Sequence, residues 1–232
     1  MLFDWLGSMP KVISSFGPSI DSMLWLIYYI TGAFFIVMEG YLVYLVIRYR
    51  QKKGTAAKYE QGNTWAQIQW IIVFSVIVLA LDLTLDFKGG KTWADVKENL
   101  PPCDLTVKVQ AKQFDWTFFY PDKDGKFGDN AVSSYRELHV PVGKKVHIIM
   151  TSLDVIHDFF LEEVRLKQDV MPLREINGWF DTTQTGKFHI VCDELCGFGH
   201  TRMTAVLQVD DQETFNKWLE DKDKEEHGGT QQ

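Results

Sequence analysis

Two long apolar runs near the N-terminus constrain this chain more than any other feature of its sequence. The first covers residues 23–47 and is apolar over 25 residues apart from Glu39, and the second covers residues 68–87. At about 1.5 Å of rise per residue, a helix of the first run is longer than the roughly 30 Å hydrocarbon layer of a bilayer. Buried core helices seldom run this long without a polar face. The sequence therefore predicts two transmembrane helices.

The charges around these runs predict their orientation. Residues 48–64 contain five basic side chains and one acidic side chain, Glu60, whereas Lys11 is the only basic side chain in residues 1–22. Positively charged loops stay in the cytoplasm. Residues 1–22 also lack the basic start, apolar stretch and cleavage site of a removable signal peptide. We therefore expect a bacterial inner-membrane protein with two spans and both termini on the periplasmic side.

Glu39 lies in the middle of the first apolar run. A charged side chain that faces lipid is costly, so we expect Glu39 to face a partner protein or a water-filled cavity. The chain is thus predicted to work inside a membrane complex.

Beyond residue 100 the pattern changes to short segments in which apolar residues alternate with polar ones. Such alternation indicates half-buried strands, and we expect them at residues 105–109, 114–120, 135–140, 146–150, 155–161, 187–191 and 204–209. This number of strands favours a Greek-key sandwich. We therefore predict three parts: an N-terminal lead with the membrane hairpin, an all-β periplasmic domain, and a C-terminal helix with a mobile acidic tail. Their bounds are residues 1–99, 100–209 and 210–232.

Most of the net charge of −7 lies in the second part of the chain, where residues 100–232 hold 23 acidic and 15 basic side chains. This acidity favours a basic partner and argues against nucleic acid. Residues 210–226 alone contribute eight acids against three lysines. Much of the charge is therefore expected to belong to a solvated tail.

The loop before the last expected strand concentrates soft metal ligands. Residues 192–203 read CDELCGFGHTRM, which brings two thiols, an imidazole and a thioether into one short segment. Ligands of this kind select copper, zinc or iron–sulfur rather than magnesium or calcium. This loop is therefore predicted to hold a metal.

The ligand set favours copper. His157 on an earlier strand, with Cys196, His200 and Met203, would complete a single electron-transfer copper site. Cys192 is then one thiolate too many for one copper, and a second bridging sulfur makes room for a second metal. A disulfide between the two cysteines or a Cys2His2 zinc site are the alternatives. Neither requires Met203 or explains an all-β domain behind a membrane hairpin.

This loop resembles that of subunit II of the haem-copper oxidases, above all cytochrome c oxidase, whose binuclear copper centre (CuA) carries the pattern C-x-E-x-C-x3-H-x2-M with a His upstream. The resemblance covers nearly the whole chain and implies a two-helix membrane hairpin followed by an all-β, cupredoxin-like Greek-key sandwich. It also implies a magnesium ion shared with subunit I through the Glu194 carboxylate. The implied copper ligands are His157, Cys192, the backbone carbonyl of Glu194, Cys196, His200 and Met203.

Two further segments resemble the family less closely. Residues 113–120 are similar to its aromatic stretch Q-W-x-W-x-Y-x-Y, which lies over the copper centre and passes electrons from cytochrome c. Phe114 stands at the first Trp of that pattern and Trp116 at the second, so both are candidates to receive electrons. The family commonly has a Glu near the start of the second helix, at the mouth of a proton path into subunit I, and Gln67 is the nearest match here.

The resemblance implies an electron-accepting subunit of a terminal oxidase. Cytochrome c or a similar periplasmic donor would deliver electrons to CuA, and haem in subunit I would receive them for oxygen reduction. The chain has no catalytic residue for the oxygen chemistry and no C-x-x-C-H motif for a c-type haem. Two alternatives are the CuA-bearing subunit of a haem-copper nitric oxide reductase and a membrane-tethered copper carrier. A carrier needs only one anchoring helix, so the hairpin argues against it.

Overall fold

The computed structural model describes residues 9–57, 59–122 and 124–228, and these form two compact units. One unit is the helical pair of residues 19–94. The other joins the described residues up to 18 with those from 95 onward into a β domain.

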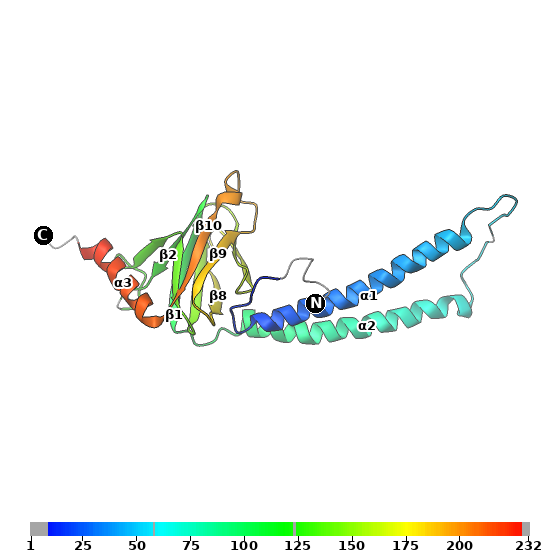
Figure 1. Ribbon diagram of the computed structural model, residues 1–232, viewed down its shortest axis with the longest axis horizontal. Coiled ribbons are helices and arrows are strands. Elements are labelled where there is room, and N and C mark those ends of the chain that lie inside the picture. The colour runs from blue at the N-terminus through cyan, green and yellow to red at the C-terminus, as the bar shows by residue number, and fades with distance from the viewer. Residues whose placement is uncertain (1–8, 58, 123, 229–232) are drawn as a thin grey trace. The chain divides into compact units, whose positions relative to one another are not determined.

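The helical unit consists of two long apolar helices, α1 (Gly17–Tyr49) and α2 (Trp65–Trp93), which run side by side (Figure 1). Both are long and apolar enough to cross a membrane, which confirms the two expected spans. Both helices extend beyond the apolar runs of residues 23–47 and 68–87. The Gln67 side chain accepts a hydrogen bond from the Thr64 backbone N–H at 3.2 Å and so caps the start of α2.

The β domain is a sandwich of two five-stranded sheets, which confirms the predicted fold class (Figure 1). The first sheet contains, in spatial order, β3 (Val132–Tyr135), β2 (Asp115–Tyr120), β1 (Leu105–Lys112), β5 (Lys145–Ser152) and β8 (Ile176–Asp181). The second contains β4 (Glu137–Pro141), β10 (Thr204–Asp210), β9 (Gly186–Cys192), β6 (His157–Leu161) and β7 (Leu166–Val170). Alternate residues of the strands fill the space between the sheets. Two short helical turns, η1 (Ala94–Glu98) and η2 (His200–Arg202), lie outside the strands.

The strands differ from the prediction in two respects. The single strand expected at residues 135–140 is two strands, β3 and β4, which belong to different sheets. Arg136 lies between them with φ of 60°, a left-handed conformation that ends the extended backbone. Strands β7 and β8 were not predicted, because neither shows a clear apolar alternation in its sequence.

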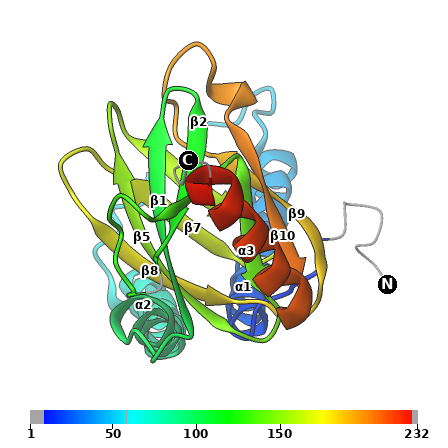
Figure 2. The same ribbon diagram turned by 90° about the vertical axis from the view of Figure 1, so that its left-hand side faces the viewer.

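The C-terminal helix, α3 (Gln212–His227), lies across one end of the sandwich (Figure 2). Its Phe215 is buried, and its Trp218 stacks on the His139 ring with centroids 3.9 Å apart. The helix continues to residue 227, and ion pairs such as Lys222 with Glu225 support its last turns. Residues 229–232 of the expected tail lie outside the described residues.

A short segment before α1, residues 9–16, packs on the β domain, and we name it the strap. Ile13 in the strap is fully buried. Its backbone N–H donates to the Glu163 carbonyl at 2.9 Å, and its carbonyl accepts from the Thr183 N–H at 2.7 Å. The strap therefore belongs to the β domain, whereas the sequence had suggested grouping it with the hairpin.

Candidate metal centre

Strand pairing brings the upstream histidine to the metal-ligand loop. β6 runs antiparallel to β9, and Phe159 of β6 pairs with Cys192 at the end of β9. His157, the first residue of β6, therefore lies beside Cys192 although 35 residues separate them in the sequence. The loop between β9 and β10, which carries the remaining candidates, projects from one end of the sandwich (orange in Figure 1).

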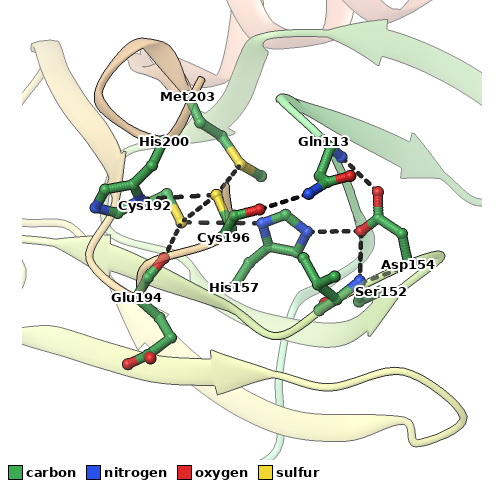
Figure 3. Close-up of polar contacts among 10 residues, drawn as sticks. Gln113, Ser152, Asp154, His157, Cys192, Glu194, Cys196, His200 and Met203 are labelled. Atoms are coloured by element: carbon green, nitrogen blue, oxygen red, sulfur yellow. Dashed lines mark hydrogen bonds and ion pairs between the residues drawn. The ribbon is translucent and has the colours of Figure 1, made fainter. Parts of the chain in front are cut away.

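Two thiols form the centre of this site. Cys192 and Cys196 are free, buried and 3.7 Å apart at their Sγ atoms. The Nδ1 atom of His157 lies 3.9 Å from Cys192 Sγ, and the Nδ1 atom of His200 lies 3.6 Å from Cys196 Sγ. Figure 3 shows the two imidazoles on opposite sides of the thiol pair. The predicted disulfide alternative does not match these separated thiols.

Two weaker donors complete the arrangement. The Met203 thioether is fully buried, with its Sδ atom 3.8 Å from Cys196 Sγ. The backbone carbonyl oxygen of Glu194 lies 3.2 Å from Cys192 Sγ, while the Glu194 side chain is exposed. The structure thus brings close together the six donors that the family resemblance implied.

The donor spacing fits shared metal ions. Sulfur and nitrogen ligands bound at about 2.3 and 2.0 Å to one tetrahedral ion lie roughly 3.5–3.8 Å apart. The thiol–thiol and thiol–imidazole separations of 3.6–3.9 Å lie within about 0.4 Å of these values. One tetrahedral zinc would use the two thiolates and two imidazoles and leave the thioether and the carbonyl without a role. A pair of copper ions would use all six donors.

The two thiols differ in acidity. Burial opposes ionisation of Cys192, but the nearby His157 ring and hydrogen bonds with backbone groups outweigh it and lower the pKa of this thiol. Burial, together with the neighbouring Cys192 sulfur, raises the pKa of Cys196. Without metal, the pair therefore tends to keep one proton, and binding a cation to both sulfurs must release it.

Two glycines let the loop pass close to the segment that precedes β2. A Cβ atom at Gly199 would lie 2.4 Å from Phe114 Cδ2, and one at Gly197 would lie 2.8 Å from Gln113 Nε2. The same Gln113 Nε2 donates a hydrogen bond to the Cys196 carbonyl at 2.6 Å. The loop is therefore held against residues 113 and 114 by close packing and by a direct hydrogen bond.

Comparison with known proteins finds a matching family model and related sequences. The family model described as cytochrome c oxidase subunit II, periplasmic domain, matches residues 105–210, from the start of β1 to the end of β10. An alternative cytochrome c oxidase subunit 2 from Bradyrhizobium diazoefficiens is 29% identical, over 87% of this chain and 79% of its own length. A cytochrome c oxidase subunit 2 from Thermostichus vulcanus is also 29% identical, over 91% of this chain and 77% of its own length.

A solved structure of the periplasmic domain of subunit II of cytochrome oxidase from Bradyrhizobium japonicum is 33% identical, over 55% of this chain and 99% of that one, with a TM-score of 0.48. The chain belongs to the cytochrome c oxidase subunit II family. Subunit II proteins are copper-binding, membrane-anchored subunits of a haem-copper oxidase complex, and the β domain here has their cupredoxin-like fold.

Within this subunit II fold, the two candidate aromatic residues occupy different environments. Trp116 is fully buried, and its ring meets the His157 ring edge-on with centroids 6.1 Å apart. Phe114 is partly exposed and covers the glycines of the ligand loop. Phe198 at the tip of that loop is fully exposed, at 103%, and Leu195 is 79% exposed. The sequence analysis did not single out these two apolar side chains.

Sequence reasoning also missed Asp154 and Gln113. Asp154 contacts the ring of His157 on the side away from the thiols, with 2.8 Å between Asp154 Oδ1 and His157 Nε2. A carboxylate three residues before a ligand histidine is the only sequence signal of this contact. Gln113 begins the aromatic stretch noted in the sequence, but its contacts could not be predicted, because they depend on how two distant loops meet.

Proposed function

We propose that this chain is the electron-accepting subunit of a haem-copper terminal oxidase. It would bind a binuclear copper centre, CuA, accept electrons from cytochrome c or a similar periplasmic donor, and pass them to haem in subunit I for oxygen reduction. The observation that carries the proposal is the buried thiol pair, 3.7 Å apart, with an imidazole on either side.

Each donor has a separate role in this proposal. The Cys192 and Cys196 thiolates and the His157 and His200 imidazoles would hold the copper. The Met203 thioether and the Glu194 carbonyl would supply weaker contacts that tune its redox potential. When bound, the copper pair supplies reversible one-electron exchange.

The protein around these donors limits how far the ligands would move when the copper is oxidised or reduced. His157 and Met203 are fully buried, and the thiols are 7% and 4% exposed. The backbone N–H of Cys192 donates to the Met203 carbonyl at 3.1 Å, which closes the base of the loop. A dry, closed site keeps the ligands in nearly the same positions in both redox states.

The exposed face of the ligand loop is the proposed approach for the electron donor. Phe198, Leu195 and Phe114 present apolar surface there. Trp116 lies behind it, in contact with His157, so both aromatic candidates remain proposals for electron uptake. Phe114 has no polar edge, unlike the Trp of the family pattern, so a donor would meet it through apolar contact.

Roles are also proposed for Glu194, for the basic loop between the helices and for the polar residues of the helices. The exposed Glu194 carboxylate is proposed to bind magnesium at the interface with subunit I. The basic loop of residues 48–64 is proposed to lie in the cytoplasm of a bacterial inner membrane, with both termini in the periplasm. Glu39 is proposed to face a membrane partner. Gln67 cannot ionise and caps α2 instead, so no proton role is assigned to it.

Copper content of the full-length chain in detergent tests the proposal. We expect two coppers per chain and a mixed-valence electron paramagnetic resonance signal. Cys192→Ser and Cys196→Ser should abolish that signal, whereas Cys103→Ser should keep it, because Cys103 lies outside the site and its thiol donates to the Pro101 carbonyl. One copper, or zinc in its place, contradicts the proposal.

Turnover of the purified complex separates the oxidase from its alternatives. We expect oxygen reduction with electrons from cytochrome c, as the names of the matched relatives favour. Turnover with nitric oxide but not oxygen would identify a nitric oxide reductase. Rapid loss of copper to a mild chelator would identify a carrier.

A further inference from the structure

The carboxylate of Asp154 lies on the opposite side of the His157 ring from the thiols (Figure 3). Its Oδ1 atom is 2.8 Å from His157 Nε2, while His157 Nδ1 faces Cys192 Sγ at 3.9 Å. Asp154 belongs to the connection between β5 and β6 and is only 27% exposed at its side chain. The imidazole is therefore held between a carboxylate and a thiol.

Backbone donors hold this carboxylate in place. Its Oδ2 atom accepts a hydrogen bond from the Gln113 backbone N–H at 2.7 Å, and its Oδ1 atom accepts one from the Val155 N–H at 2.7 Å. The Ser152 hydroxyl lies 3.4 Å from Oδ1. Because donors already occupy both oxygens, the carboxylate meets His157 as an acceptor.

An acceptor at Nε2 decides the tautomer of the ring. A neutral imidazole has one N–H and one lone pair, and a neighbouring acceptor requires the N–H on the nitrogen that faces it. Nε2 of His157 must then carry the hydrogen, and the lone pair lies on Nδ1, which faces the thiols. Outer carboxylates commonly orient metal-binding histidines in this way.

Gln113 links the same carboxylate to the ligand loop. Its backbone N–H donates to Asp154, and its side-chain Nε2 donates to the Cys196 carbonyl at 2.6 Å. A shift of Asp154 would therefore disturb His157 directly and Cys196 through Gln113. The two contacts connect a ligand on β6 with a ligand on the loop after β9.

We propose that Asp154 is a positioning residue, which holds His157 in the Nε2–H tautomer and, through Gln113, fixes the ring relative to Cys196. This inference rests on the proposed copper site. It assigns no direct metal contact to Asp154, whose effect on the metal passes through His157.

The tautomer can be read in the wild-type chain without any substitution. Full-length, metal-free protein with 15N-labelled histidine would be studied by long-range 1H–15N correlation at a pH where the imidazole is neutral. We expect a His157 pattern with the hydrogen on Nε2. The opposite tautomer, or an even mixture of the two, overturns the proposal even if no variant folds.

Asp154→Asn is the matched substitution, because an amide has the same shape but can donate to Nε2 and stabilise the wrong tautomer. The control is Asp122→Asn. Asp122 Oδ1 also accepts two backbone N–H groups, both at 2.9 Å, but in the turn that follows β2 and with no histidine. Copper affinity, measured against a competing chelator, should fall by about 10- to 100-fold in Asp154→Asn, as expected for loss of an outer carboxylate. Asp122→Asn should bind copper like the wild type.

The midpoint potential of the copper centre gives a second measurement. Together with the affinity, it distinguishes failure of the Asp154 positioning role from failure of the proposed function. The copper midpoint potential should rise in Asp154→Asn, since a nearby negative charge is lost, and stay unchanged in the control. Wild-type affinity and potential in Asp154→Asn, or equal losses in both variants, would overturn the positioning role alone. Failure of the wild-type chain to bind two coppers would instead reject the proposed function.

Discussion

Gly199→Ala should disrupt the ligand loop for a purely steric reason. Gly199 has φ of −92°, which alanine adopts readily, so the substitution causes no backbone strain. The new methyl group would, however, lie 2.4 Å from Cδ2 and 2.5 Å from Cγ of Phe114. Ordinary contacts between carbon atoms are about 3.5–4.0 Å. The ring of Phe114 or the loop must therefore move by roughly 1 Å.

Overpacking of this kind typically costs about 1–3 kcal/mol. We expect a loss of that size in the free energy of unfolding of the β domain. We also expect weaker copper retention, because the displaced loop carries Cys196 and His200 on either side of Gly199. Thermal unfolding of the full-length chain, followed by the β-sheet circular dichroism signal, measures the first effect, and chelator competition measures the second.

The double variant Gly199→Ala with Phe114→Ala supplies the decisive comparison. Removing the ring removes the clash, so the two substitutions should be less destabilising together than the sum of their separate effects, by about 0.5–3 kcal/mol. Gly128→Ala is the matched control, because a Cβ atom there meets nothing within 4 Å. If Gly199→Ala unfolds like the control, or if the effects of the two substitutions simply add, the steric reasoning is wrong.

Three further predictions concern the rest of the β domain. Ile13→Ala should lower the free energy of unfolding by about 2–5 kcal/mol through a cavity under the strap, whereas Leu173→Ala, at a fully exposed side chain, should leave it unchanged in the same denaturation assay. Tyr120→Phe should cost about 1–3 kcal/mol, because the Tyr120 hydroxyl both donates to the His139 carbonyl and accepts from the His139 N–H; calorimetry that finds no loss would reject this. Asp211 caps α3, and hydrogen bonds from the first turn of that helix lower its pKa. The stabilisation that the Asp211 carboxylate gives the folded state should therefore be fully present above the ordinary carboxyl pKa and be lost as the pH falls through the lowered pKa. The unfolding midpoints of Asp211→Ala and the wild type should then differ at neutral pH and converge in acid.

The strands show where local pattern succeeds and where it fails. Strands β2 and β5 alternate strictly between buried and partly exposed residues, and β1 does so from its second residue, so their period-two pattern predicted them. β7 reads LKQDV, with only its end residues buried, and β8 contains Asn177 and Gly178, so neither carries that pattern. Both form because neighbouring strands, β6 and β5, supply their hydrogen-bond partners.

The strap and Trp116 also show that a local sequence pattern does not determine tertiary contacts. The strap has no periodicity to assign it to either unit, and tertiary contacts such as its backbone bonds to Glu163 and Thr183 place it on the β domain. Trp116 was a candidate for electron uptake from its position in the sequence, whereas the fold buries it against His157. Alternation indicates that one face of a strand is buried but does not say which residues it meets.

The sequence by itself determined the two membrane helices and the chemistry of the site. An apolar run of sufficient length has one stable form in a bilayer, and the donors of the ligand loop are close together because they are close in the chain. Only the tertiary structure decided that His157 faces Cys192, that Asp154 holds its ring and that Gln113 joins both to Cys196. These contacts depend on strand register and loop packing between distant segments, and no local pattern of residues specifies them.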